Sequence, residues 1–456
     1  MKQVDFPHSF TGSPAPATNL PELMCAFSYA LDLTEGQPEG HSLRACWIAM
    51  RIADAIRIGR DERRIIFFAT LLKDLGCSSN SARVAEIYLT DDRSFKHDFK
   101  LIGDGIGPAL RFVLEKTGRG AGPVARISAI ANILKNGPAL VDEMIAARCT
   151  RGADIARMLR FPEEVALGIH ALDEHWDGGG RPAGLSGQAI ALPARIALLA
   201  QVADVFFCNA GPDAAREEVV RLSGKWLDPE LVRAFTAISA SPDFWARLAQ
   251  PDLERMLAEE LPDEAQLTVD EDYLDAIALA FGQVIDAKSP YTAGHSERVG
   301  TYATELGKRY GIDGADLRSL SRAAALHDVG KLGVSSTILE KPGKLDDEEW
   351  QVMRSHAGHT AAILGRIAPL REMAMIAASH HERLDGTGYP LGLDQTMLAT
   401  EARIISVCDF YDALTADRPY RAAMTAERAF AIMEQEAGGA IDPHCLAMFR
   451  DVVAER

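Results

Sequence analysis

Residues 43–59 read LRACWIAMRIADAIRIG, and apolar residues recur in this stretch at every third or fourth position. The same spacing returns in residues 274–287, LDAIALAFGQVIDA. This period is typical of amphipathic α-helices, and alternating strand patterns are scarce in the rest of the chain. The sequence therefore predicts an all-α protein with Gly/Pro-rich connecting loops at 176–187, 341–346 and 385–393.

Length and composition indicate a globular chain with room for two or three domains, since 47% of its 456 residues are apolar and 25% are charged. No apolar run approaches the roughly 20 residues of a membrane helix, and the N-terminal residues lack the pattern of a signal peptide. We therefore expect a cytoplasmic protein without a membrane partner. The seven cysteines show no C-x-x-C spacing, so neither a disulfide framework nor a zinc ribbon is indicated.

The net charge of −17 argues against a nucleic-acid polymer or an anionic membrane as partner, because phosphate contacts depend on Lys and Arg. A small anionic substrate remains compatible with it, since a few local Arg side chains can offset a distant acidic surface.

Five short stretches of the first half of the chain recur in the same order in the second half. The first two are displaced by 254 residues, as from His41 to His295, and the next two by 208, as from Gly178 to Gly386. The pairs are GHSLR with GHSER, LLKDLG with ALHDVG, WDGGGRP with LDGTGYP, ARI with ARI, and LDPELVRAF with IDPHCLAMF. The chain is therefore interpreted as a tandem duplication whose first copy holds about 46 extra residues between its second and third matches.

The duplication sets the predicted domains. Residues 1–20 are expected to be a mobile tail because they are rich in Pro, Ser, Thr and Gly without periodicity. We expect the first copy at 21–257, an acidic linker at 258–272 and the second copy at 273–456.

The second copy carries a set of imidazoles and carboxylates that suits iron, manganese or zinc. Seven ligands exceed the needs of one four-coordinate ion, so two metals are the natural number, with an Asp beside a His as the bridge. A lone His in a helical protein is usually a core or surface residue, and His359 and His444 are interpreted in that way. The candidate ligands are His295, His327, Asp328, His356, His380, His381 and Asp409.

The motifs around these residues resemble a known family. In order, GHSERV, HDVGK, KPGKLDDEEWQVMRSH, HHERLDGTGYP and ARIISVCDFYDALTADRPYR are similar to the HD-GYP branch of the HD-domain metal-dependent phosphohydrolases. The resemblance implies tandem HD-domain helical bundles, of which the second is catalytic. It also implies a centre of two or three divalent metal ions, commonly iron or manganese, that hydrolyses cyclic dinucleotides, chiefly cyclic di-GMP.

Carried over residue by residue, the resemblance divides the ligands between two metals. One would be held by His295, His327, Asp328 and Asp409, and the other by His356, His380 and His381 with Asp328 shared. Lys331 would lie beside the reacting phosphate, and Asp328 would be part of the catalytic centre. Some members hold a third metal through a Glu four residues before the first His. Tyr291 occupies that position here, so two metals are expected.

Three further residues are candidates for substrate contacts. Arg418 and Arg421 in DRPYR could bind phosphate in a bidentate manner, as these positions do in the family, although exposed helix-end arginines are the alternative. The glycines and proline of GTGYP predict a tight turn that directs Tyr389 to the substrate. A buried packing role for this Tyr is the other interpretation.

The first copy retains His41 and Asp74 but has lost the other ligands. His170 and His175 lie out of register and are interpreted as ordinary helix-end and loop residues. The replacements are Lys73 for His327, Cys77 for Lys331, Leu172 and Asp173 for the His pair, Gln201 for Asp409, Arg181 for Tyr389, and a residue near Thr150 for His356. We therefore expect a non-catalytic copy that is kept for a structural or regulatory role.

The function predicted from the sequence is hydrolysis of cyclic di-GMP to linear pGpG, and onward to GMP, by a hydroxide that bridges two cations. Two alternatives remain: a non-catalytic adaptor that binds a cyclic dinucleotide or a protein, and a phosphohydrolase of another nucleotide. Beyond the dinucleotide, a homodimer and signalling proteins are the partners considered.

Overall fold

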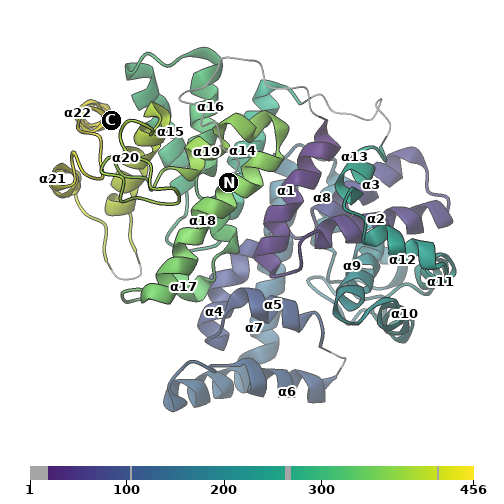
Figure 1. The fold of residues 1–456 in the computed structure, drawn as a ribbon. Coiled ribbons are helices and arrows are strands. Elements are labelled where there is room, and N and C mark those ends of the chain that lie inside the picture. The colour runs from purple at the N-terminus through teal and green to yellow at the C-terminus, as the bar shows by residue number, and fades with distance from the viewer. Residues whose placement is uncertain (1–18, 103–104, 262–268, 419–420) are drawn as a thin grey trace. The chain divides into compact units, whose positions relative to one another are not determined.

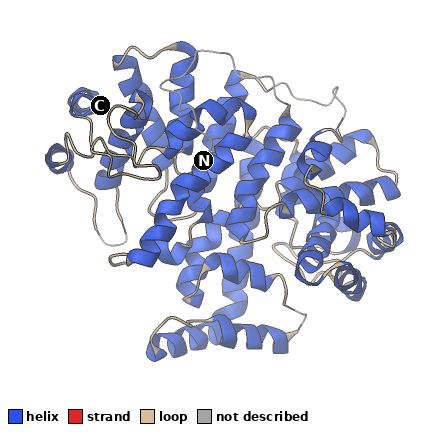
Figure 2. Ribbon diagram, in the orientation of Figure 1, coloured by secondary structure: helices blue, strands red, loops and turns tan. Residues whose placement is uncertain are grey.

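The computed structural model describes residues 19–102, 105–261, 269–418 and 421–456. Among these residues all regular structure is helical, apart from isolated β-bridges, and Figure 2 shows no strand in them. The prediction of an all-α protein is therefore confirmed. The predicted tail at 1–20 lies outside the described residues up to position 18, and Leu20 already begins a helix. Residues 262–268 of the predicted linker also lie outside them.

The chain divides into two units, one of residues 19–268 and one that begins at Val269 and ends at Arg456. In Figure 1 the first unit is coloured purple to teal and the second green to yellow. The last helix of the first unit ends at Ala258 and the first helix of the second begins at Glu271.

The N-terminal unit contains thirteen described α-helices and two short 3-10 helices. They are α1 (Leu20–Glu35), α2 (His41–Ala55), α3 (Arg60–Leu71), η1 (Cys77–Asn80), α4 (Ser81–Tyr88), α5 (Asp92–Phe99), α6 (Ile106–Lys116), α7 (Pro123–Met158), α8 (Glu163–His170), η2 (Gly187–Ala189), α9 (Leu192–Ala210), α10 (Pro212–Arg221), α11 (Pro229–Ile238), α12 (Pro242–Leu248) and α13 (Leu253–Ala258).

The C-terminal unit repeats most of this order. Its helices are α14 (Glu271–Asp286), α15 (His295–Arg309), α16 (Gly314–Leu326), η4 (Val329–Gly333), α17 (Ser336–Leu339), α18 (Asp347–Arg366), η5 (Ala368–Leu370), α19 (Arg371–Ala378), α20 (Thr400–Thr415), α21 (Ala426–Gln435) and α22 (Pro443–Ala454).

The helices confirm the duplication that the sequence predicts. At a displacement of 254 residues, α2 coincides with α15, and at 208 residues α8 coincides with α19. The last part of α7, from residue 139, coincides with α18 at the same displacement of 208. The extra segment of the first copy therefore consists of α5, α6 and the first part of α7.

Pro138 marks the place where the extra segment joins the repeat. It lies inside α7, at the position that corresponds to Asp346, the N-cap of α18. Proline is normally tolerated only at the start of a helix, because it lacks the N–H that a helix interior requires. The C-terminal copy begins a new helix at this point with a capping box between Asp346 and Glu349, whereas the N-terminal copy continues the helix from the extra segment.

The core of each unit is formed by the helices that carry the repeated motifs. In the C-terminal unit α15 packs on α16 and α20, and in the N-terminal unit α2 packs on α3 and α9. One helix, α9, has the length and apolar composition of a membrane span, but 61% of its apolar window is buried inside the structure. Its apolar residues therefore serve as the core of a helical bundle.

Candidate metal centre

The seven candidate ligands come together in the C-terminal unit from five places in the chain. His295 is the first residue of α15 and follows Gly294, whose φ of 69° lies in the left-handed region that favours glycine. The other six are His327 and Asp328 after α16, His356 in α18, His380 and His381 after α19, and Asp409 in α20.

The carboxylate of Asp328 lies at the centre of the cluster. Its Oδ2 is 3.6 Å from Nε2 of His295 and 3.4 Å from Nε2 of His327. Its Oδ1 is 3.6 Å from Nε2 of both His356 and His380. Donor atoms bonded to one ion at about 2.1 Å lie roughly 3–3.5 Å from one another. The two oxygens of Asp328 thus face two separate groups of nitrogen donors, which is the geometry of a bridging carboxylate.

Asp409 completes the donor group on the Oδ2 side. Its Oδ1 lies 3.4 Å from Nε2 of His295 and 3.8 Å from Nε2 of His327. On the other side, the Oδ1 of Asp328 is buried and accepts no hydrogen bond from the described residues. A buried charged oxygen without a partner is costly, and a bound cation would remove that cost.

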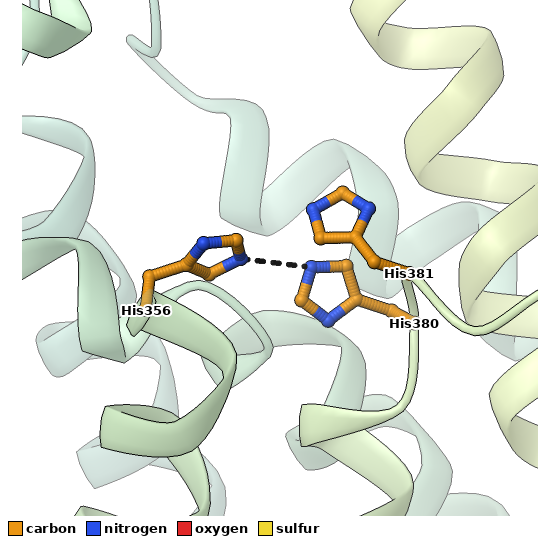
Figure 3. Close-up of side chains that lie close together, drawn as sticks. All are labelled: His356, His380 and His381. Carbon is orange, nitrogen blue, oxygen red and sulfur yellow. Dashed lines mark hydrogen bonds between the residues drawn. The ribbon is translucent and has the colours of Figure 1, made fainter. Parts of the chain in front are cut away.

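His356, His380 and His381 form the second donor group, and one ring nitrogen from each lies within 4.8 Å of the others. Figure 3 shows His356 facing the adjacent pair His380 and His381. The dashed line joins Nε2 of His356 to Nε2 of His380, which are 3.4 Å apart. Three imidazoles that converge in this way suit a divalent transition metal.

The ring nitrogens on the far side of the histidines are held by hydrogen bonds. The Nδ1 atoms of His327, His356 and His380 each contact the carbonyl oxygen three residues earlier at 2.6–2.7 Å. The Nδ1 of His295 lies 2.7 Å from Oδ2 of Asp412. When Nδ1 donates in these contacts, Nε2 keeps its lone pair, so the backbone and Asp412 prepare the rings for metal binding.

The electrostatics of the second donor group and of Asp328 favour the forms that bind metals. Burial lowers the pKa of His356 to about 3 and that of His381 to about 4, so these imidazoles are neutral at pH 7. Burial opposes ionisation of Asp328, but Lys331 and His327 outweigh it and hold the pKa of this carboxyl well below its ordinary value. Neutral imidazole and ionised carboxylate are the protonation states of metal ligands. In the first donor group, burial is outweighed by Asp328 and Asp409, which raise the pKa of His327 to about 10, so a metal ion must displace a proton there.

A cavity of about 1050 Å³ adjoins the cluster and is lined by four ligand histidines, Asp328 and Asp409. Lys331, Tyr389, Arg418 and Arg421, which were predicted to act on the substrate, also line it. The ammonium of Lys331 contacts the carboxylate of Asp328, and the ring of Tyr389 lies 4.9 Å from that of His381. The structure thus brings the predicted site residues to one cavity, except His327, which is fully buried behind it.

Arg421 has a second role that the sequence did not indicate. Its guanidinium donates to the carbonyl oxygens of Ala413, Leu414 and Ala422 at 2.7–3.0 Å. Its backbone also pairs with that of Arg418. Arg421 therefore holds the loop after α20, and its contact with phosphate stays a prediction, as does that of Arg418.

Two features of the site were missed by sequence reasoning. Asp412 contacts His295, and its spacing of three residues from Asp409 on one helix was an available signal. The guanidinium of Arg354 lies over the rings of both Trp350 and Tyr389, at 5.8 and 5.5 Å. Trp350 also lines the cavity, so an aromatic surface lies next to the metal ligands.

In the N-terminal unit, the matching positions bring together cations that belong to the chain itself. Lys73, which replaces His327, contacts the carboxylate of Asp74, and both side chains are fully buried. The Nζ of Lys100 lies 2.7 Å from Glu35 and 3.8 Å from Asp74. Although burial raises it, these ammonium groups hold the pKa of Asp74 well below its ordinary value. Carboxylates that ammonium groups already neutralise offer little to a metal ion.

The structure also identifies the counterpart of His356, which the sequence places near Thr150, as Arg148. Gly76 packs against the backbone of Arg148 in the same way as Gly330 packs against that of His356. Arg148 and His356 are 208 residues apart, which is the displacement of the third and fourth repeated stretches. The sequence comparison was less secure here because the extra segment ends nearby.

Arg148 also pairs with a residue at a second ligand position of the first copy. Its guanidinium contacts the carboxylate of Asp173, which stands where the C-terminal unit has His381. Leu172 and Gln201 occupy two more ligand positions and offer no imidazole or carboxylate. The first copy therefore contains an internal network of ion pairs at the positions of the ligands, next to the three donor atoms of Glu35, Asp74 and Cys77, which lie within 4.8 Å of one another.

One supporting contact is common to both copies. In the N-terminal unit, Nδ1 of His41 lies 2.7 Å from Asp204, whose carboxylate is also bound by Arg44. The C-terminal unit has the same arrangement between His295 and Asp412. The contact links two core helices of the bundle, which explains its presence where the metal ligands are lost.

Comparison with known proteins places this architecture in a family. A model described as "HD domain" matches residues 120–216 and 280–445, which fall in both units. The chain belongs to the HD-GYP branch of the HD-domain phosphohydrolases. These are metal-dependent enzymes, which agrees with the donor set around Asp328.

Among curated relatives, "3'3'-cGAMP-specific phosphodiesterase 3" of Vibrio cholerae is 48% identical over 431 residues, 94% of this HD-GYP chain and 94% of the relative. "Cyclic di-GMP phosphodiesterase" of Thermotoga maritima is 34% identical over 39% of this chain and 49% of its own length. A crystal structure of a cyclic GMP-AMP specific phosphodiesterase of V. cholerae is similar over 96% of this chain and 98% of its own, with 42% identity and a TM-score of 0.65.

Proposed function

We propose that the chain is a metal-dependent phosphodiesterase of 3',3'-cyclic dinucleotides, and that its C-terminal unit carries the activity. The observation that carries this proposal is the carboxylate of Asp328 between two groups of histidine donors, at the wall of a cavity of about 1050 Å³. Volumes of this order are at the upper end of small-molecule sites and accommodate a dinucleotide.

Two divalent ions, with iron or manganese expected from the family, would be held at the two donor groups. His295, His327 and Asp409 would bind one ion, His356, His380 and His381 the other, and Asp328 would bridge both. Such ions supply a water-derived nucleophile at neutral pH and offset the growing charge on the phosphate. The protein holds the imidazoles in one orientation through their Nδ1 hydrogen bonds.

We assign Lys331 to the scissile phosphate. Its ammonium lines the cavity and contacts Asp328, so a phosphate at the donor groups would meet a positive charge at their edge. An ammonium group that is already held in position, in a site from which water is excluded, stabilises the transition state more than a mobile cation would.

The second phosphate of the dinucleotide requires donors away from the metal ligands. We assign this role to Arg418 and Arg421, which line the same cavity. The bases would be met by the surface that Trp350, Arg354 and Tyr389 form, since purines stack on aromatic rings and on guanidinium planes.

We propose that 3',3'-cGAMP is the preferred substrate and that cyclic di-GMP is hydrolysed less efficiently. The relative that carries the cGAMP name is similar across 94% of this chain, whereas the cyclic di-GMP relative of T. maritima matches only 39% of it. Opening of one phosphodiester to a linear dinucleotide, followed by slower cleavage to mononucleotides, is the expected course. A cytoplasmic location is part of the same proposal.

The test is turnover of a panel of cyclic dinucleotides by the full chain after loading with manganese or anaerobically with iron. We expect hydrolysis of cGAMP at a higher kcat/KM than cyclic di-GMP, with cyclic di-AMP slower than both. If none of the three is hydrolysed while two metal equivalents are bound, the proposed activity is wrong. A chain that binds no metal and yet binds the dinucleotides would favour the adaptor alternative.

The ion pairs of Lys73, Lys100 and Arg148 favour a non-catalytic role for the N-terminal unit. We propose that this unit supports or regulates the catalytic one. Metal analysis tests whether the N-terminal unit lacks a metal centre, since the full chain should then bind two ions and not four.

A further inference from the structure

A buried carboxylate follows directly on the adjacent pair of ligand histidines. Glu382 is 1% exposed. Its Oε1 accepts hydrogen bonds from the backbone N–H groups of Leu391 and Gly392 at 2.6 and 3.2 Å, and its Oε2 accepts from that of Leu393 at 2.9 Å. A buried carboxylate is costly unless donors satisfy its oxygens, so Glu382 and this segment hold each other in place.

The three donors lie just beyond Tyr389, on the loop of residues 386–393 that carries it. The backbone N–H of Tyr389 donates to the carbonyl oxygen of His381 at 3.2 Å, so the loop folds back on the ligand pair. Gly388 permits this approach, because a Cβ atom there would lie 2.5 Å from the Cα atom of Glu382. The carboxylate of Glu382 therefore closes this loop on the metal ligands.

The closed loop places the ring of Tyr389 at the cavity. The ring lies 4.9 Å from that of His381, and the guanidinium of Arg354 lies 5.5 Å from its centroid. Tyr389 is among the residues that line the cavity, whereas Glu382 is not. Any effect of Glu382 on a molecule in the cavity must therefore pass through the loop.

The N-terminal copy has the same buried carboxylate. Glu174 lies 208 residues before Glu382 and is 2% exposed. It accepts hydrogen bonds from the backbone N–H groups of Ala183 and Leu185 at 2.6 and 2.8 Å. Because this copy has lost most of its metal ligands and keeps these contacts, the carboxylate is required by the loop and not by the metals.

The two loops differ in the side chain that they present. Arg181 stands where the C-terminal copy has Tyr389, and it forms an ion pair with Asp142. Tyr389 instead faces a ligand histidine and the cavity. The same hold on the loop is thus structural in the first copy, whereas in the second it sets the position of a side chain at the proposed substrate site.

We propose that Glu382 is a positioning residue of the dinucleotide site, which fixes Tyr389 where a base stacks without itself touching the substrate. The proposal rests on the function proposed above. Glutamine in place of Glu382 keeps the size of the side chain but turns one acceptor oxygen into an NH2 donor. The carboxamide cannot accept from the N–H groups on both sides, so the loop should open while the metal ligands stay in place.

Hydrogen exchange and kinetics of the full chain test the proposal together. In E382Q the backbone amides of 391–393 should exchange faster, because they lose a buried acceptor. KM for 3',3'-cGAMP should rise about fivefold or more, while kcat stays within about twofold and the metal content is unchanged. E174Q is the matched control: the amides of 183–185 should exchange faster, and KM should keep its wild-type value.

A double variant shows whether Glu382 acts through Tyr389. E382Q/Y389A should have the same KM as Y389A, because the effects of two residues that act through one contact do not add. G388A is a second route to the raised KM, since the added Cβ pushes the loop away from Glu382 and leaves the carboxylate intact. Its control G180A, in the N-terminal copy, should keep the wild-type KM. Circular dichroism identifies a variant that has lost its fold, and G388A then decides in place of E382Q.

An E382Q protein with the wild-type KM would overturn the proposal, and so would a rise in KM that adds to that of Y389A. Loss of metal from E382Q would show that the carboxylate supports the ligand pair and not Tyr389. A wild type that hydrolyses none of the dinucleotides would overturn the proposed function itself, and Glu382 would then have only the structural role that Glu174 has.

Discussion

The Nδ1 of His295 lies 2.7 Å from Oδ2 of Asp412, on the side of the ring that faces away from Asp328. Arg298 binds the same carboxylate at 2.6 Å and fixes its position. A carboxylate behind a ligand imidazole sets the tautomer, orients the ring and raises its basicity toward a metal. Asp412 is therefore expected to act on metal binding without touching the metal.

Replacing this carboxylate tests that role. In D412N the amide cannot serve as the same charged acceptor, so we expect metal affinity to fall roughly 10–100-fold with a parallel loss of activity at limiting metal. Titration with manganese followed by turnover measures the change, and excess metal should restore part of the rate. D451N, at an exposed carboxylate of α22, serves as the control. Equal manganese affinity in D412N and D451N would contradict the prediction.

Asp328 should be required for both ions, because each of its oxygens faces a different donor group. We expect D328N to bind far less than two equivalents of metal and to lose at least ~100-fold in kcat. Metal content by mass spectrometry and turnover of cGAMP measure the two effects. H444A is the control, since His444 is exposed and lies outside the cluster. Retention of two ions by D328N would exclude a bridging role.

The buried pair of Lys73 and Asp74 should stabilise the N-terminal unit. K73M leaves the Asp74 carboxylate buried with one ammonium fewer, and breaking such a pair costs about 3–5 kcal/mol. Urea unfolding followed by tryptophan fluorescence reports on this unit, because four of the five tryptophans lie before residue 250. The exposed pair of Arg233 and Glu230 provides the control R233M, for which a loss below ~1 kcal/mol is expected. Similar losses in both variants would show that Lys73 is not structurally important.

His41 should make the same unit less stable in mild acid. Burial, reinforced by Lys73, lowers its pKa from the ordinary 6.5 to about 4, so between these values the unfolded chain binds more protons than the folded one. Stability from this residue is complete above pH 6.5 and is lost as the pH falls toward 4. Asp32 acts in the opposite sense, because burial raises its pKa to about 6.

The contribution of His41 is therefore measured as a difference between wild type and H41Q. From pH 7 to pH 5 the free energy of unfolding of the wild type should fall by about 2 kcal/mol more than that of H41Q. Unfolding curves at the two pH values, with the same tryptophan signal, give both numbers. Parallel curves for the two proteins would mean that His41 does not titrate as described.

The sequence predicted the helical class, the duplication and the seven clustered side chains, because each depends on a local pattern or on a repeat of fixed displacement. It did not predict Lys100 as a neighbour of Asp74, since α5 belongs to the extra segment and has no counterpart to compare. It located the counterpart of His356 near Thr150, and backbone packing was needed to identify the residue as Arg148. The contacts of a side chain in an insertion can be identified only when the path of the insertion is known.

The last prediction concerns recognition of the bases. Trp350 lines the cavity, and the guanidinium of Arg354 lies over both its ring and that of Tyr389. Stacking of a base on an aromatic side chain contributes ~1–3 kcal/mol, so W350A should raise KM about 10-fold or more while metal content stays at the wild-type value. W350F keeps an aromatic face and should recover most of the affinity. If W350A lowers kcat and leaves KM unchanged, the tryptophan acts on the arrangement of the metal ligands and not on the base, because lost stacking weakens binding before it slows the reaction.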